Sequence, residues 1–154
     1  MIMSRRIFRR LLPLLLLAIL AAALSSRPAG EPAIRTLFSP TGKEHRLQKT
    51  ISEELRKARK SIRIAMYTFT STTIARTLAS IRQEGAIDIR ILIDKQQFDQ
   101  CLEQKVPAAK ILEESGIAIR RVDLRAEGEQ KGAEPPHFHH KFCVIDDSAV
   151  ITGS

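Results

Sequence analysis

The sequence has two cysteines, one tyrosine, no tryptophan and no glycine-rich phosphate-binding pattern. Cys101 and Cys143 are too few to form the disulfide framework of a small secreted scaffold. Without a glycine-rich fingerprint, enzymes that bind nucleotide cofactors are poor candidates. A hydrophobic content of 44% over 154 residues is enough for one domain with a core, and it argues against an intrinsically disordered chain.

Acidic residues are absent from the first 25 positions, where four arginines precede an apolar run. This run, residues 11–24, is 14 residues long, shorter than the roughly 20 residues that cross a bilayer as a helix. A basic start, an apolar middle and small residues before position 26 are typical of a secretory signal peptide. We therefore predict a signal peptide at 1–25, cleaved rather than kept as an anchor, and a linker at 26–32. The protein should be periplasmic or secreted, without a stable membrane span.

The formal net charge of +8 belongs partly to this N-terminal segment. Removing its four arginines leaves 21 basic and 17 acidic residues, a net charge of +4. Such a charge is compatible with a polyanionic partner but does not require one.

The rest of the chain alternates between helical and strand periodicity. Apolar residues at spacings of three and four predict helices at 44–59, 72–84 and 107–115. Alternating and β-branched residues predict strands at 33–38, 61–69, 87–94, 117–122, 138–145 and 149–152. A turn is expected at 39–42 and a charged loop at 124–136. This order predicts an α/β fold in which helices flank a mixed, partly parallel sheet, as one domain over 33–154.

Residues with chemical potential gather near the C-terminal end of the sequence. On a strand, positions two apart face the same side, so His139 and Lys141 should project together. Two potential cations repel unless an anion lies between them, and a phosphate is the natural anion. Asp146 could pair with Lys141 or orient a ring nitrogen. Gly153 and Ser154 could bring a close backbone approach and a hydroxyl to the same group.

The spacing of these residues resembles the motif of the phospholipase D superfamily. His139, Lys141, Asp146, Gly153 and Ser154 fill the pattern of His-x-Lys, four residues, Asp, six residues and Gly-Ser. The upstream segments 38–40, 64–70 and 89–94 also look like the small, single-motif bacterial periplasmic endonucleases of that superfamily. The resemblance covers 34–154, and it implies the superfamily's α/β sandwich with its C-terminal part missing.

The resemblance implies a phosphodiesterase that needs no metal ion and no other cofactor. The motif histidine, here His139, would attack phosphorus and form a phosphohistidine, and a second histidine from another copy would protonate the leaving oxygen. A homodimer is therefore implied. Lys141, Gly153 and Ser154 would bind the phosphate, and Asp146 would support catalysis. The implied substrate is nucleic acid, cut without sequence specificity. Phospholipid head groups are an alternative because the same residues serve both.

Other interpretations stay open. Superfamily members continue past Gly-Ser with an asparagine ligand and an acidic partner for the imidazole, so we expect a fragment of a longer protein or a truncated product. A truncated product would be a non-catalytic remnant or a phosphate-binding module. A zinc site of His137, His139, His140 and Cys143 fits no standard spacing, and His140 should face away from His139. A Cys101–Cys143 bridge is conceivable, although Cys143 in an apolar strand indicates a buried thiol.

Overall fold

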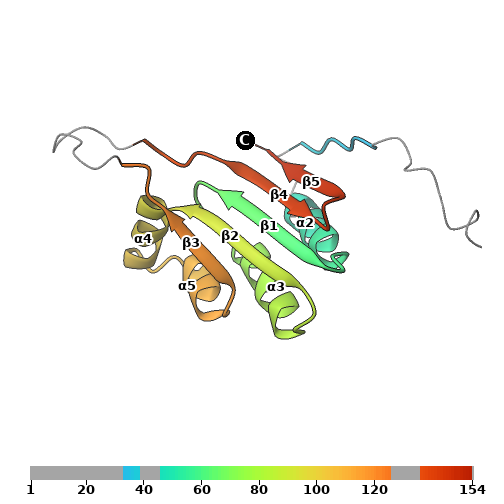
Figure 1. Cartoon of the computed structure of the whole chain (residues 1–154), viewed down its shortest axis with the longest axis horizontal. Coiled ribbons are helices and arrows are strands. Elements are labelled where there is room, and N and C mark those ends of the chain that lie inside the picture. The colour runs from blue at the N-terminus through green and yellow to red at the C-terminus, as the bar shows by residue number, and fades with distance from the viewer. Residues whose placement is uncertain (1–32, 39–45, 126–135, 154) are drawn as a thin grey trace, which may run out of the picture. The chain divides into compact units, whose positions relative to one another are not determined.

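The structure is a computed structural model that describes residues 33–38, 46–125 and 136–153 (Figure 1). The chain divides into two units, Met1–Leu37 and Phe38–Ser154. Residues 33–38 have no regular secondary structure, so the strand predicted there is wrong. Ile34 is 93% exposed, and a segment without a buried face has little to favour a strand. The predicted signal peptide, linker and turn lie outside the described residues. No helix within the described ranges is long and apolar enough to cross a membrane.

Five strands of the second unit form one mixed sheet in the order β3-β2-β1-β4-β5. The strands are β1 (Ser61–Met66), β2 (Asp88–Asp94), β3 (Ala118–Val122), β4 (Lys141–Ile145) and β5 (Ala149–Thr152). β1, β2 and β3 are parallel, β4 runs antiparallel to β1, and β5 runs antiparallel to β4. The predicted α/β fold with a mixed, partly parallel sheet is confirmed.

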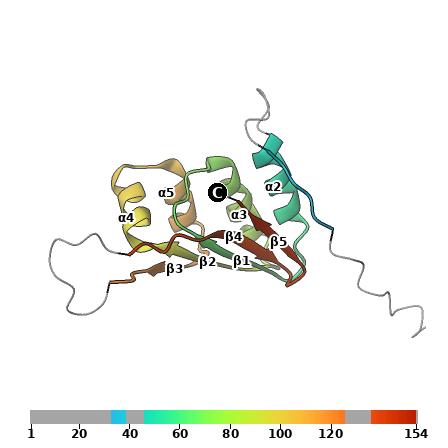
Figure 2. The same cartoon turned by 90° about the horizontal axis from the view of Figure 1, so that it is seen from above.

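Four described helices lie on the same face of this sheet (Figure 2). They are α2 (Arg46–Arg56), α3 (Thr72–Gln83), α4 (Lys95–Glu103) and α5 (Pro107–Glu114). α3 begins where the Ser71 side chain accepts the N–H of Ile74, and α5 begins with Pro107, which has no N–H to leave unpaired. α4 was not predicted from the sequence, and it follows β2 without a loop. Asp94 ends the strand and caps the helix.

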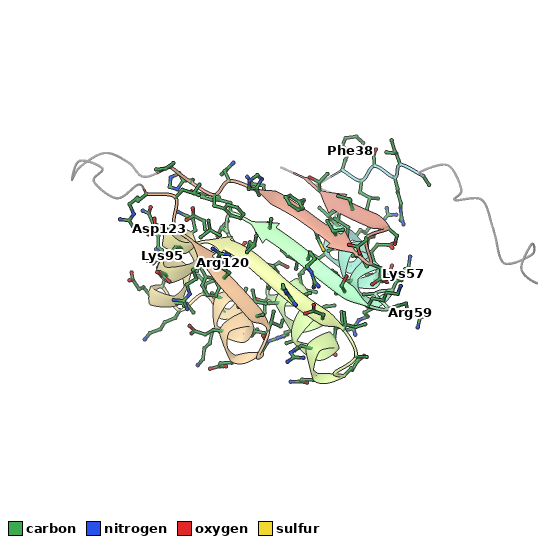
Figure 3. All side chains as sticks on the ribbon, in the orientation of Figure 1. Phe38, Lys57, Arg59, Lys95, Arg120 and Asp123 are labelled. Carbon is green, nitrogen blue, oxygen red and sulfur yellow. The ribbon has the colours of Figure 1, made fainter. Side chains whose placement is uncertain are left out.

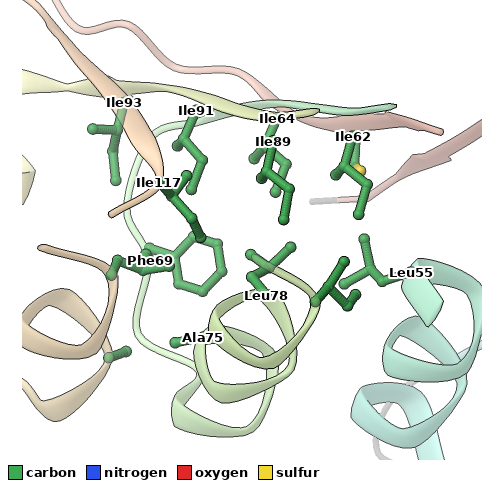
Figure 4. Packing of buried hydrophobic residues seen from close by; sticks show 14 of the residues in the cluster. Leu55, Ile62, Ile64, Phe69, Ala75, Leu78, Ile89, Ile91, Ile93 and Ile117 are labelled. Atoms are coloured by element: carbon green, nitrogen blue, oxygen red, sulfur yellow. The ribbon is translucent and has the colours of Figure 1, made fainter. Parts of the chain in front are cut away.

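The core lies between these helices and the inner face of the sheet. Figure 4 shows isoleucines of the two central parallel strands pointing toward the helices. They are Ile62, Ile64, Ile89, Ile91 and Ile93, none more than 5% exposed. Leu78 of α3 and Leu55 of α2 meet them from the helical side, both at most 1% exposed. Burial of each such side chain is worth about 1.5–3 kcal/mol. This packing fixes the positions of the strands and therefore of their carboxyl ends.

Candidate active site

The predicted motif begins at the end of the sheet that is formed by the carboxyl ends of the parallel strands. Lys141, the first residue of β4, pairs with Met66, the last residue of β1. His139 lies in the preceding segment, residues 136–140, which has no regular secondary structure. Lys95 and Asp123, which follow β2 and β3, lie at the same edge (Figure 3). Ligands of open α/β sheets bind outside the carboxyl ends of the strands, so the motif lies where this fold favours a site.

The imidazole of His139 and the ammonium of Lys141 are in direct contact. Lys141 Nζ lies 3.0 Å from Nε2 and 3.2 Å from Nδ1 of the ring. An ammonium can only donate hydrogen bonds, so the ring nitrogen that accepts from it is unprotonated and presents a lone pair. The structure thus brings these two predicted residues together as a potential nucleophile and a fixed positive charge.

The positive charge of this pair has no carboxylate partner within the described residues. The ion pairs of those residues involve other basic side chains, and none includes Lys141 or His139. His139 is exposed and Lys141 is half-buried, so an anion can approach both. A charged donor without a carboxylate partner, next to an imidazole, favours binding of a phosphate-like anion.

Tyr67, the first residue after β1, packs against the pair. Its ring centroid lies 4.5 Å from that of His139 and 5.4 Å from that of His137, and Lys141 Nζ lies 5.6 Å from it. Its N–H donates to the carbonyl of His140 at 2.7 Å, which extends the β1–β4 pairing past the strand end. Tyr67 therefore restricts the ring of His139 while leaving its nitrogens to Lys141.

Asp94 is a buried acid at the carboxyl end of β2, and it was not predicted to belong to the site. It is 4% exposed. Its Oδ1 accepts the N–H of Gln97 at 3.0 Å, and its Oδ2 accepts the N–H of Phe138 at 2.9 Å. The second bond reaches the residue just before His139. The available signal was its position, because an acid that closes a β-branched strand lies at the carboxyl edge of a parallel sheet.

Asp146 lies at the opposite end of β4, and the predicted pairing with Lys141 or a ring nitrogen is wrong. Its carboxylate accepts the backbone N–H groups of Ser61, Arg59 and Lys60 at 2.9, 2.7 and 2.8 Å. These bonds, that of Ser61 first, hold the pKa of Asp146 below its ordinary value because they stabilise the charged form. Figure 3 shows Arg59 at this far edge. Asp146 therefore fastens the start of β1 to the turn after β4.

The same residue also shapes that turn. Asp146 and Asp147 have φ values of 51° and 55°, and the N–H of Ser148 donates to the carbonyl of Ile145 at 3.0 Å. Positive φ at both central residues is the φ pattern of a type I′ turn, here within the three-residue connection between Ile145 and Ala149, and aspartate tolerates it better than most residues. Asp146 thus has two structural tasks that its place in the motif did not reveal.

Gly153 returns to the beginning of β4. Its N–H donates to the carbonyl of Lys141 at 3.4 Å, and the hydroxyl of Thr152 donates to the same carbonyl at 3.0 Å. The structure therefore places Gly153 beside the backbone of Lys141, at the predicted site. Ser154, the predicted phosphate-binding hydroxyl, lies outside the described residues.

The remaining histidines and cysteines have other surroundings. The ring of His140 lies 4.7 Å from Phe138 and 5.9 Å from Phe142, apart from the rings around Tyr67, as its predicted orientation requires. Cys101 and Cys143 are both buried and free, and burial raises the pKa of Cys143 to about 12. Among the described residues, no group of three or more His, Cys, Asp or Glu is arranged to hold a metal ion.

Comparison with known proteins by sequence gives two results. The profile of the family described as "Cardiolipin synthase, PLD-like domain" matches residues 51–154. Mitochondrial cardiolipin hydrolase from Xenopus tropicalis is 27% identical over 100 residues, which cover 65% of this chain and 40% of that protein. The chain thus spans less than half of the length of this curated relative.

Comparison of the fold adds two solved structures. Nuc from Salmonella typhimurium, a phospholipase D family member, matches with a TM-score of 0.55 and 28% identity over 75% of this chain and 65% of its own. NucT from Helicobacter pylori matches with a TM-score of 0.52 and 22% identity over 68% of this chain and 64% of its own. The second likeness concerns the fold alone.

Proposed function

Because the chain belongs to the phospholipase D superfamily, we propose that it hydrolyses phosphodiester bonds with His139 as the nucleophile. One observation carries this proposal: Lys141 Nζ contacts both ring nitrogens of His139, and no carboxylate of the described residues pairs with it. A phosphodiester can take the place that a carboxylate leaves open. Since the nucleophile is a side-chain nitrogen, the reaction needs no metal ion to activate water in its first step.

In the proposed reaction, a ring nitrogen of His139 attacks phosphorus and the bond to the leaving oxygen breaks. A second imidazolium gives its proton to that oxygen, and Lys141 stabilises the negative charge on the non-bridging oxygens. Water then attacks the phosphohistidine. The second imidazole takes the proton of the water, the phosphorus–nitrogen bond breaks, and His139 is free again. The leaving group keeps the proton it received, water supplies a hydroxyl to phosphorus and a proton to the second imidazole, and the enzyme thus regains its starting protonation state.

The second imidazole comes, in this proposal, from another copy of the chain. His137 is the other histidine next to Tyr67, but its Nδ1 lies 3.9 Å from Oδ2 of Asp94, which engages that ring away from the Lys141 contact of His139. His140 contacts Phe138 and Phe142 instead. A two-fold homodimer that joins the two His139–Lys141 pairs supplies the missing acid with the same residue. Gly153 and Ser154 would add phosphate contacts beside Lys141.

We propose nucleic acid as the substrate. The net charge of +4 outside residues 1–25 favours a polyanion whose affinity comes from phosphate contacts. The exposed position of His139 fits a long, unspecific substrate better than a small enclosed one. Phospholipid head groups are the second candidate, because the relative from Xenopus tropicalis is named a cardiolipin hydrolase.

The test measures turnover by the purified full chain in the presence of a chelator of divalent metals. Plasmid DNA, RNA and cardiolipin vesicles are offered separately, and His139→Ala is compared with His140→Ala. The two variants remove the same ring from nearby positions, but the ring of His140 contacts Phe138 and Phe142 in the described part of the chain and not the Tyr67 ring. We expect cleavage of nucleic acid by the wild type and His140→Ala and its loss in His139→Ala, by at least about 10³-fold.

Other outcomes distinguish the alternatives. Turnover of cardiolipin alone would replace the nucleic-acid proposal with the phospholipid one. Loss of turnover in the chelator, or full activity of His139→Ala, would overturn the mechanism. A folded dimer without turnover of any of the three substrates would support a non-catalytic, phosphate-binding module, and inorganic phosphate would then serve as the probe.

We also propose that the protein works in the periplasm or outside the cell. The basic, apolar and small-residue parts of residues 1–25 support this location. Expression of the full chain in a bacterium, followed by fractionation and measurement of the intact mass, tests it. Recovery of the uncleaved chain from the cytoplasm would contradict the proposal.

A further inference from the structure

Asp94 connects three parts of the molecule that meet at the edge of the sheet. It is the last residue of β2, it caps α4 through Gln97, and it binds the backbone of residues 136–140 through Phe138. Its side chain is 5% exposed. A buried carboxylate is costly unless its oxygens are hydrogen-bonded, and here each oxygen takes a different backbone N–H. One side chain therefore makes two separate hydrogen bonds, one that caps α4 and one that holds residues 136–140.

The bond to Phe138 matters because the segment around it has few other restraints. Within residues 136–140, the backbone bonds are a local one from the N–H of His139 to the carbonyl of His137, and that from Tyr67 to the carbonyl of His140. Strand pairing with β1 begins only at Lys141. The carboxylate of Asp94 thus holds the backbone one residue before His139, in a segment that strand pairing does not restrain.

The positions of the His137 and His139 side chains depend on the same part of the backbone. Nδ1 of His137 lies 3.9 Å from Oδ2 of Asp94, and the rings of His137 and His139 both contact Tyr67. A shift at Phe138 would move both rings relative to Tyr67. It would also move His139 away from Lys141, whose position is fixed by β4.

We propose that Asp94 is a positioning residue for His139. This inference rests on the proposed function. Asp94 itself makes no contact with the substrate, but it orients His139, which does. Because reacting atoms must meet within a narrow geometry, a misplacement of about 1 Å lowers the rate by roughly 100-fold. Loss of the bond to Phe138 should therefore lower kcat more than it raises KM.

Asp94→Asn is the variant that separates this role from helix capping. Asparagine is as good a cap as aspartate, so its single carbonyl oxygen can keep the N–H of Gln97. Its NH₂ group cannot accept the N–H of Phe138. Gln97→Pro is the converse change: it removes the donor in the first turn of α4, where proline is tolerated, and leaves the bond to Phe138. Asp99→Asn is the matched control in α4, where it loses only pairs with Lys95 and Arg121.

The experiment uses the full chain and two readouts. We expect kcat of Asp94→Asn on plasmid DNA to fall by about 10- to 100-fold with KM nearly unchanged, and Gln97→Pro and Asp99→Asn to stay within about threefold of the wild type. NMR should show faster hydrogen exchange at the Phe138 amide and shifted ring resonances of His139 in Asp94→Asn alone. An unchanged kcat in Asp94→Asn, or an equal loss in Gln97→Pro, would overturn the inference.

The second readout keeps the two proposals distinguishable. If the wild type does not cleave any phosphodiester, the proposed function fails, but the NMR comparison still decides whether Asp94 positions His139. Unchanged exchange at Phe138 and unchanged His139 resonances in Asp94→Asn would then overturn this inference by themselves. Changes confined to Asp94→Asn would support it.

Discussion

The two ends of β4 carry residues of one motif in opposite electrostatic situations. At the first residue, Lys141 Nζ contacts the His139 ring, and no described carboxylate pairs with it. Directly after the last residue, the Asp146 carboxylate accepts three backbone N–H groups. Five residues of strand separate Lys141 and Asp146 by about 16 Å. The positive end is open to a ligand, whereas the negative end is occupied by the protein's own backbone.

This difference shows that the residues of one sequence motif can serve two purposes, some at the candidate site and some in holding the fold together. His139 and Lys141 stand two residues apart, and the segment that leads into β4 brings their side chains into contact. Asp146 stands where the strand turns, because its left-handed φ and its carboxylate together close the hairpin and fasten β1. Changes at the two ends should therefore affect different measurements.

After His139→Ala, the largest effect is expected from Lys141→Ala. Removing a fixed positive charge from a developing phosphoryl charge should lower kcat/KM by roughly 10²- to 10³-fold. The melting temperature should change little, because Gly153 and Thr152 bind the backbone carbonyl of Lys141 and not its side chain. Lys110→Ala, on the exposed side of α5, is the control. Equal activities of the two variants would show that the end of β4 near His139 is not the reactive one.

A smaller effect is expected from Tyr67→Ala. An aromatic pair is worth about 0.5–1.5 kcal/mol, so loss of the ring beside His139 should lower turnover by about tenfold. Tyr67→Phe keeps the ring and should stay close to the wild type, since the described contacts with His139, His137 and Lys141 involve the ring. Parallel assays of the two variants check this. A loss as large in Tyr67→Phe as in Tyr67→Ala would point to the hydroxyl instead.

Asp146→Asn should change stability without a specific effect on turnover. Asparagine tolerates the left-handed φ, so the substitution isolates the carboxylate. Because the pKa of Asp146 is lowered in the folded state, its stabilisation is complete above the unfolded pKa of about 3.9 and is lost as the pH falls through the folded value. Urea unfolding of both proteins from neutral pH to about pH 3 measures this. We expect the wild type to be more stable at neutral pH and the difference to shrink in acid.

Asp147→Asn is the matched control for that experiment. Asp147 has a similar φ of 55°, but its carboxylate takes no hydrogen bond from the residues that the structure describes. Its unfolding free energy should follow that of the wild type across the pH range. A pH-independent difference between Asp146→Asn and the wild type would contradict the assignment of Asp146 to the backbone of residues 59–61.

The smallest effect is expected from alkylation of the cysteines in the middle of the fold. The pKa of Cys143, raised to about 12 by burial, keeps its thiol protonated at neutral pH, and thiols react as thiolates. Iodoacetamide at neutral pH should leave the mass of the native protein unchanged and add two groups after unfolding in urea. Rapid labelling of native Cys143 would show that β4 opens between its two ends.

The fold was largely predictable because its signals are local. Alternating isoleucines in residues 87–94 and the helical spacing of apolar residues in 72–84 predicted these elements to within a few residues. α4 was missed because only Phe98, Cys101 and Leu102 are apolar among its nine residues, and no loop separates it from β2. The strand at 33–38 was overpredicted because the short pattern was read without knowledge of its exposure.

The site was predictable only in part, because its chemistry depends on distant contacts. The contact of His139 with Lys141 was predicted from alternation along a strand, although His139 lies just before β4 in a segment without regular secondary structure. The partners of Asp146 lie 85 to 87 residues away in the sequence and are backbone groups, which no residue pattern identifies. Asp94 reaches Phe138 across 44 residues in the same way. Side chains that bind backbone far along the chain leave no spacing signal.

The position of β4 next to β1 has a consequence for the order of folding. β1 pairs with β2 across the connection that contains α3, but its other edge is covered only by β4, roughly 80 residues further along the chain. Until β4 docks, the edge of an apolar strand is free to pair with other chains. The segment that brings His139 is thus also the one that closes this edge. We expect protection of the β1 amides and the native His139 resonances to arise in one refolding phase, which pulsed hydrogen exchange with NMR detection can check.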